Sequence, residues 1–204
     1  MNAGDRALAL KVQPAIREAA ALAGMEFDNA QWNYRQLDCT AIPNHLFLLF
    51  ESHRGAGDLS RFSVSIPRAG NGKLRIIPVE RRGFTLFAPA AVNPLAIAIF
   101  NLIRAEEPKG PPADWLAASA CYAALTAPRG EVALSPQGKA DADFALSYPP
   151  SIEMGEQGES TVRFVNVAIA SEPMQWALTY NAAGQLETVE HFPAPVYATR
   201  MIPK

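Results

Sequence analysis

Features that would point to a particular function are missing from this sequence. The longest uninterrupted apolar run, from Leu95 to Phe100, is far shorter than the about 20 residues that cross a bilayer, so we expect no helical membrane span. The sequence contains no G-x-S-x-G, H-E-x-x-H, C-x-x-C, P-loop or dinucleotide glycine pattern. We therefore predict no cofactor and favour a protein that is not an enzyme.

Cysteine is also scarce, because Cys39 and Cys121 are the only two in 204 residues. Two widely spaced cysteines cannot form a structural zinc site. They can form a disulfide if their Cα atoms come within about 7 Å, and two buried free thiols are the equally weighted alternative.

The compartment is linked to the state of these cysteines. The first residues, MNAGDRALAL, lack the basic start, continuous apolar stretch and cleavage site of a secretory signal. A signal that has been removed leaves no trace in a mature chain. We expect a periplasmic or secreted protein, with a cytoplasmic protein as the alternative.

The overall composition is that of a globular protein. The sequence is 49% hydrophobic and 19% charged, with a net charge of -2, so it lacks the basic excess that would suggest a nucleic-acid partner. Its length suits one buried core, and we predict a single α+β domain over residues 1–204.

The order of the predicted elements gives the fold class. Apolar spacing predicts a helix over 5–22 capped by Asp5, although Pro14 should bend or split it, and Asn93-Pro94 and Asp114 open two more. In the helix opened by Asn93-Pro94, the core candidates are Leu95, Ile99, Leu102 and Ile103. A β-meander over 44–83 and C-terminal hairpin strands complete an antiparallel sheet packed against about three helices. Residues 149–160 lack periodicity and predict a surface loop.

The register of the last meander hairpin follows from Asn71-Gly72, the strongest short hairpin signal in the sequence. With these as the two turn residues, Val64 pairs with Val79 and Ile66 with Ile77. The same register sets Arg68 opposite Arg75 and Arg61 opposite Arg82. Pro78 cannot donate a ladder hydrogen bond, which predicts an edge strand or a bulge.

A weak acid-base candidate lies where the first meander strand ends. Glu51 and His53 share one side of that strand, beside a turn that contains Asp58, and a hydrolase or lyase could use such a group. Solvated turn residues are the simpler interpretation. Asp141 and Asp143 share a strand face, but two carboxylates fall short of a calcium ligand set, so we predict no metal site.

The sequence departs from an even charge distribution in one region. Residues 51–83 hold seven basic and three acidic side chains. The basic sheet edge, defined as Arg61, Arg68, Arg75, Arg81 and Arg82, could bind an acidic protein surface or a small anion. The competing interpretation is that these charges prevent edge-to-edge association of sheets. We favour a binding or interaction protein, with the Glu51, His53 and Asp58 enzyme as the alternative.

Overall fold

The computed structural model describes residues 1–25, 32–53, 59–69, 72–81, 84–85, 92–107, 114–127, 131–133, 149–167 and 174–193. Helices and strands are segregated along the chain, which confirms the α+β class. The elements are α1 (Ala3–Leu22), β1 (Trp32–Gln36), β2 (His45–His53), β3 (Leu59–Pro67), β4 (Arg75–Arg81), β5 (Phe84–Thr85), α2 (Pro94–Arg104), α3 (Trp115–Thr126), β6 (Glu131–Ala133), β7 (Ser151–Met154), β8 (Ser160–Val167), β9 (Met174–Tyr180) and β10 (Leu186–Pro193).

The strands form two antiparallel sheets. The first has the order β1-β2-β3-β4-β5, and the second has the order β10-β9-β8-β6, with β7 also pairing with β8. The meander and the C-terminal hairpin therefore belong to different sheets. The strand β7 lies in the stretch predicted to be a surface loop, so that prediction was wrong for residues 151–154.

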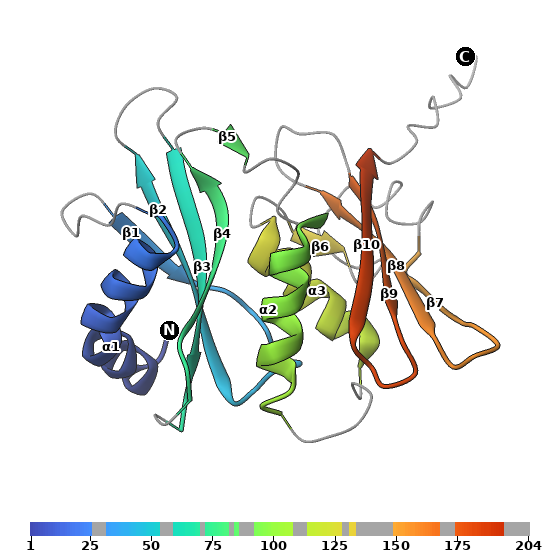
Figure 1. Ribbon diagram of the computed structural model, residues 1–204, viewed down its shortest axis with the longest axis horizontal. Helices are drawn as coiled ribbons and strands as arrows, with labels where there is room; N and C mark the ends of the chain where they lie inside the picture. Colours follow the sequence, from blue (N-terminus) through green and yellow to red (C-terminus); the bar gives the residue numbers. More distant parts are fainter. Residues whose placement is uncertain are drawn as a thin grey trace, which may run out of the picture.

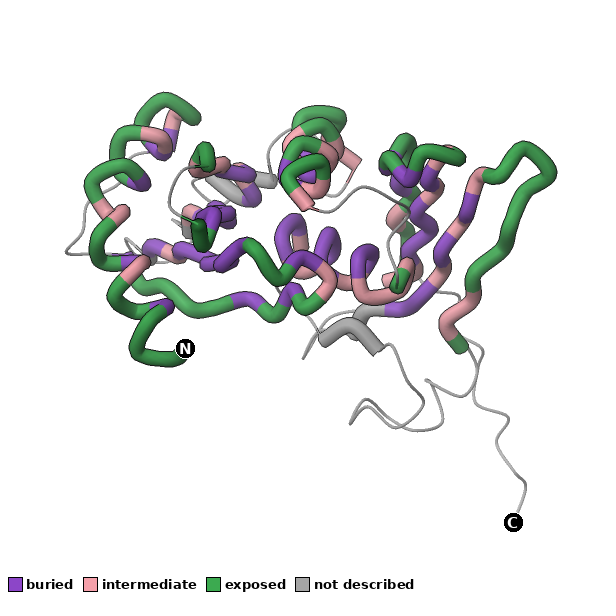
Figure 2. The backbone as a smooth tube through the Cα atoms, turned by 90° about the horizontal axis from the view of Figure 1, so that it is seen from below, coloured by how far each residue is buried: buried purple, intermediate pink, exposed green. Residues whose placement is uncertain are grey.

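The elements stack in four layers, as Figure 1 shows. Helix α1 covers one face of the first sheet, where Ile16 packs with Leu48 and Val64. The opposite face of that sheet packs against α2 and α3, and the second sheet lies beyond these helices. Buried residues accordingly gather in the strands and in the middle of the molecule, whereas the outer turns of α1 are exposed (Figure 2).

Helix starts follow the predicted caps with one exception. Asn93 Oδ1 accepts the Leu95 N–H at 2.9 Å, and Asp114 Oδ1 accepts the Ala117 N–H at 2.9 Å. The cap of α1 is Asn2, which accepts the Asp5 N–H, so the prediction of Asp5 as the cap was wrong. Helix α1 also continues through Pro14 without splitting.

The register of β3 and β4 differs from the predicted one by three residues. Val64 pairs with Ile76 and Ser65 with Arg75, and a bulge follows because Phe62 pairs with Pro78 while Arg61 pairs with Glu80. The bulge beside Pro78 confirms one of the two predicted alternatives, and β4 is not an edge strand because it also pairs with β5. All four predicted pairs were wrong: Val64 with Val79, Ile66 with Ile77, Arg68 with Arg75 and Arg61 with Arg82.

The end of β3 is held by the start of β2 instead of by β4. Pro67 has no N–H to donate to a ladder. The next N–H, that of Arg68, donates to the Asn44 carbonyl at 2.8 Å. Arg68 is thereby placed outside the ladder with β4.

The C-terminal hairpin agrees with its prediction. Residues 181–185 connect β9 to β10, and Gly184 has a φ of 75°, the left-handed conformation that glycine adopts readily. Asn181 Oδ1 accepts the backbone N–H groups of Ala183 and Gln185, each at 3.0 Å, which fixes the turn.

Candidate functional site

Three arginines of the basic sheet edge are engaged by carboxylates of the same chain. Arg61, 8% exposed, has its Nε 2.7 Å from Glu51 Oε1. Arg68 binds Asp5 on α1, whose side chain is only 5% exposed. Arg75 Nη2 donates to Glu106 Oε1 at 2.5 Å, just beyond α2. These guanidinium groups therefore join β3 and β4 to neighbouring elements.

The remaining members of the predicted sites are only partly described. Arg81 is the last residue of β4, and its side chain lies outside the described part, as does all of Arg82. Their proposed role in binding a partner stays a prediction.

The residues of the acid-base candidate are also only partly described. His53 ends β2 with no described side chain, and Asp58, Asp141 and Asp143 lie outside the described residues. Glu51 is described, and its carboxylate is held by Arg61. Glu51 thus has a partner within its own sheet, and its role in an acid-base group stays a prediction.

A buried polar cluster that the sequence did not reveal lies at the other end of the first sheet. His45 opens β2, and its Nδ1 is 2.7 Å from the Oγ of Ser65 on β3. Its Nε2 is 3.5 Å from Glu106 Oε2, the carboxylate that also binds Arg75. The cluster brings together residues that are distant in the sequence. Sequence patterns did not indicate it, because single polar residues in a strand show no periodicity.

A hydroxyl, an imidazole and a carboxylate are also the components of an acyl-transfer triad. Ser65 is 2% exposed and His45 is 4% exposed, so no substrate carbonyl can reach the Ser65 hydroxyl in this conformation. Burial lowers the pKa of His45, against the opposite effects of Glu106 and Glu107, which keeps the ring neutral at pH 7. The cluster serves to fasten the C-terminal end of α2 to the first sheet.

A second polar group fastens the same helices to the second sheet. Tyr180 OH on β9 is 3.0 Å from Ser119 Oγ on α3, and burial raises the pKa of Tyr180 to about 12. Arg104 on α2 lies over the Tyr180 ring at 5.6 Å and donates to Gly184 O at 2.5 Å. Asn101 bonds both the N–H and the carbonyl of Leu186, at 2.9 and 2.8 Å.

The two cysteines form a disulfide, which decides between the two predicted states. Cys39 lies between β1 and β2, and Cys121 lies within α3, with Cα atoms 4.8 Å apart. Both residues are buried, at 9% and 1% exposure. The bridge therefore attaches the β1–β2 connection to the middle layer.

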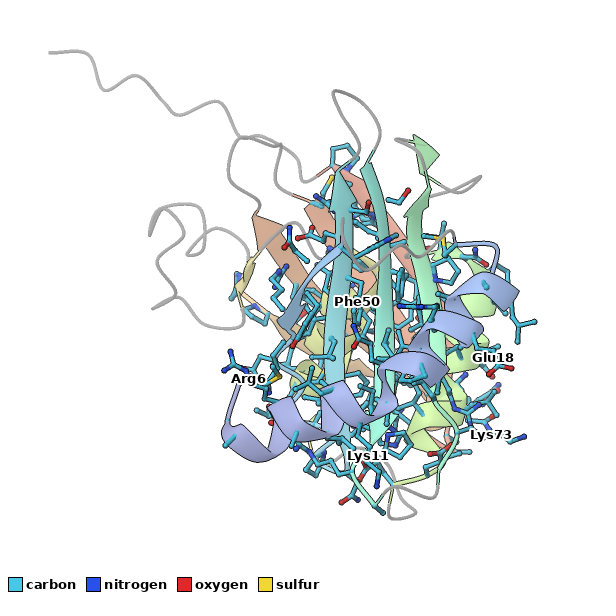
Figure 3. All side chains as sticks on the ribbon, turned by 90° about the vertical axis from the view of Figure 1, so that its left-hand side faces the viewer. Arg6, Lys11, Glu18, Phe50 and Lys73 are labelled. Atoms are coloured by element: carbon cyan, nitrogen blue, oxygen red, sulfur yellow. A yellow bond between two sulfur atoms is a disulfide. The ribbon has the colours of Figure 1, made fainter. Side chains whose placement is uncertain are left out.

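Unlike Arg61, Arg68 and Arg75, a set of exposed cations has no ion pair with any carboxylate among the described residues. We define the α1 basic face as Arg6, Lys11, Arg17 and Lys73. Figure 3 views the molecule from this side, with Arg6 at the left of α1, Lys11 below its middle and Lys73 at the right. Glu18 is the exposed acid on the same helix.

Neither a metal-binding cluster nor a membrane-spanning helix is found among the described residues. No group of three or more His, Cys, Asp or Glu residues there could hold a metal ion. None of the helices in those ranges is long and apolar enough to cross a membrane. Comparison with known protein families, curated proteins and solved structures finds nothing that matches this chain.

Proposed function

We propose that this chain is a non-catalytic binding protein of an oxidising compartment, and that its α1 basic face contacts an acidic protein surface. The observation that carries the proposal is the contrast between two sets of cations. Arg61, Arg68 and Arg75 are held by internal carboxylates, whereas the α1 basic face is exposed and unpaired within the described residues. A cation without an internal partner keeps its charge available for a partner molecule.

The helical spacing places two of these cations, Arg6 and Arg17, on one side of α1. Asp5, Ala9, Ile16 and Ala20 form the buried stripe of α1. Arg6, Leu10 and Arg17 are spaced by four and seven residues, so they share a stripe one position round the helix from the buried one. Leu10 is 58% exposed between the two arginines. An apolar side chain flanked by cations suits an acidic protein surface that also offers an apolar contact.

Arg68 adds little charge to the α1 basic face, because Asp5 neutralises it. Its side chain remains 39% exposed although it binds Asp5. The α1 basic face is a local concentration of positive charge on a chain whose net charge is -2. Such local asymmetry steers an acidic partner to one side of the molecule.

The disulfide supports the oxidising compartment. Disulfides persist in secreted and periplasmic proteins and are rare where thiol reductants are abundant. Because Cys39 and Cys121 are both buried, the bridge is protected from solvent-borne reductants once the chain has folded.

The test uses poly-L-glutamate as the acidic probe, with binding followed by fluorescence anisotropy of the labelled polymer. We expect the wild-type chain to bind at about 20 mM salt and to lose binding at about 200 mM salt, because screening weakens exposed charge pairs. The triple variant Arg6→Gln/Lys11→Gln/Arg17→Gln should lose most of the low-salt binding.

The matched control lowers the net charge equally but away from α1. Met154→Glu/Gln157→Glu/Thr188→Glu places three new acids on exposed positions of the second sheet and its β7–β8 turn. We expect this control to retain binding. Equal loss in both triple variants, or no binding by the wild type, would refute the α1 basic face as the contact surface.

A further inference from the structure

Helix α2 has an apolar outer face that was predicted to be core. Ala96, Phe100 and Ile103 are its buried residues. Leu95 and Leu102, both predicted to be core residues, are 56% and 49% exposed, so those predictions were wrong. Figure 1 shows α2 at the front of the molecule, and the outer turns of the same helix are green in Figure 2.

The exposed residues of this face follow the spacing of a coiled-coil seam. We define the α2 outer stripe as Leu95, Ala98, Leu102 and Ala105, all of which are exposed. Their intervals of three, four and three residues match alternate a and d positions of a heptad. One side of α2 thus packs in the core, and the other has the pattern of a helix that meets a second helix.

The order of large and small residues identifies the second helix. If another copy of α2 lies antiparallel on the stripe, with the two-fold axis near residue 100, Leu95 faces Ala105 of the partner and Ala98 faces Leu102. Every leucine then meets an alanine, so each large side chain fills the space left by a small one. A parallel arrangement would put leucine on leucine and alanine on alanine, which leaves gaps beside the alanines.

We propose that this protein forms a two-fold symmetric dimer through antiparallel packing of the α2 outer stripe. A surface that complements itself under a two-fold rotation is what a closed dimer requires. Antiparallel helices also place their dipoles favourably, and Glu106 comes near the amino-terminal turn of the partner's α2. Asn101 and Arg104 do not interfere, because both bond to the β9–β10 hairpin of their own chain.

The size of the surface sets the expected strength. Helix α2 has 11 residues and exposes two leucines on this face. Such a helix pair buries less than the about 1,600 Å² of a standard interface. We therefore expect a weak dimer that dissociates on dilution, with a Kd on the order of 10 μM to 1 mM.

Sedimentation equilibrium over about 5 μM to 1 mM protein tests the proposal. The wild-type weight-average mass should rise toward twice that of one chain. Ala98→Leu should reduce dimer formation at least about tenfold, because the larger side chain would collide with Leu102 of the partner. Leu102→Ala should also weaken the dimer, because the shortened side chain leaves a gap against Ala98.

The double variant is the decisive measurement. Ala98→Leu/Leu102→Ala exchanges large and small residues on both chains and restores the fit, so dimer formation should return toward the wild-type level. Leu22→Ala, on the 84%-exposed Leu22 of α1, is the control and should not affect association. Thermal unfolding of each variant checks that the fold is intact.

Two results would overturn the dimer. A wild type that stays monomeric up to about 1 mM would do so, and so would a double variant weaker than either single variant. Monomeric wild type that binds phosphatidylcholine vesicles through Leu95 and Leu102 would instead assign the stripe to a lipid surface.

Discussion

Removal of the Cys39–Cys121 disulfide has a consequence whose size can be calculated from the structure. The bridge closes a loop across a sequence separation of 82 residues. The chain-entropy relation for that separation gives about 4.5 kcal/mol of stabilisation at 25 °C, through restriction of the unfolded chain. Globular proteins have a total free energy of unfolding of about 5–15 kcal/mol. Loss of the bridge should therefore remove about a third or more of the stability.

Urea unfolding of oxidised wild type, reduced wild type and Cys39→Ala/Cys121→Ala provides the measurement. With an m-value of about 2 kcal/mol per M, the urea midpoint should fall by about 2 M on reduction. The reduced chain keeps both sulfur atoms at sites that are 9% and 1% exposed, so it isolates the effect of the covalent bond. The alanine variant should be less stable again by about 1 kcal/mol, because two buried sulfur atoms are lost.

The outcome that contradicts this reasoning is a common midpoint for the oxidised and reduced chains with an unchanged m-value. The β1–β2 connection would then be held to α3 by packing alone, and the unfolded chain would gain no freedom from reduction. Such a result would also weaken the inference of an oxidising compartment, because a chain that is equally stable as a dithiol does not need one.

Two further changes in stability are expected. Burial lowers the pKa of His45 and of His191 below the ordinary value of 6.5. The unfolded chain therefore binds more protons than the folded chain in the range between these lowered pKa values and about pH 6.5. The urea midpoint should fall between pH 7 and pH 5, with a smaller fall in His45→Gln. An equal midpoint at both pH values would contradict this. Gly184→Ala should cost about 1 kcal/mol in urea unfolding, because its φ of 75° disfavours a Cβ. Gly4→Ala, in the first turn of α1, is its control and should leave the midpoint unchanged or raise it; an equal loss in both variants would argue against the φ explanation.

Local chemistry made several elements predictable from the sequence. Asn93 and Asp114 cap their helices through contacts with the next two or three residues, and Gly184 closes a four-residue turn. Each of these signals depends on neighbours in the chain. The sequence also named the two cysteines, but it could not choose between bridge and thiols because that choice depends on a Cα distance across the fold.

The register of β3 and β4 was not predictable because both faces of the first sheet are covered. Hydrophobic alternation fixes register when only one face is buried. Here Ile76 packs with the α1 side and Ile77 with the α2–α3 side, so a shift that exchanges them still buries an isoleucine on each face. The pattern therefore allowed Asn71-Gly72 to be interpreted as a two-residue turn.

The candidate site was predictable only in its residue types. The arginines of the sheet edge stand out in the sequence, yet Asp5 is 63 residues from Arg68 and Glu106 is 31 residues from Arg75. The amino-acid composition gives the number of such charges but does not show which of them form ion pairs. Their pairing leaves the α1 basic face as an exposed positive surface within the described residues, although the first 25 residues have only a slight excess of basic side chains.

Helix α3 explains why the chain needs polar contacts between its layers. Its buried residues occupy two sides of the helix, with Ala118, Cys121 and Leu125 on one side and Ser119 and Ala123 on the other, as expected for a helix packed between two sheets. Apolar contacts of such a helix are not directional, so they fix neither its rotation nor its position along its axis. Directional contacts do so: Ser63 on β3 donates to the Leu125 carbonyl at 2.8 Å, and on the other side Ser119 meets Tyr180. The buried polar groups thus determine how the two sheets are aligned across α3, and this accounts for them without a catalytic role.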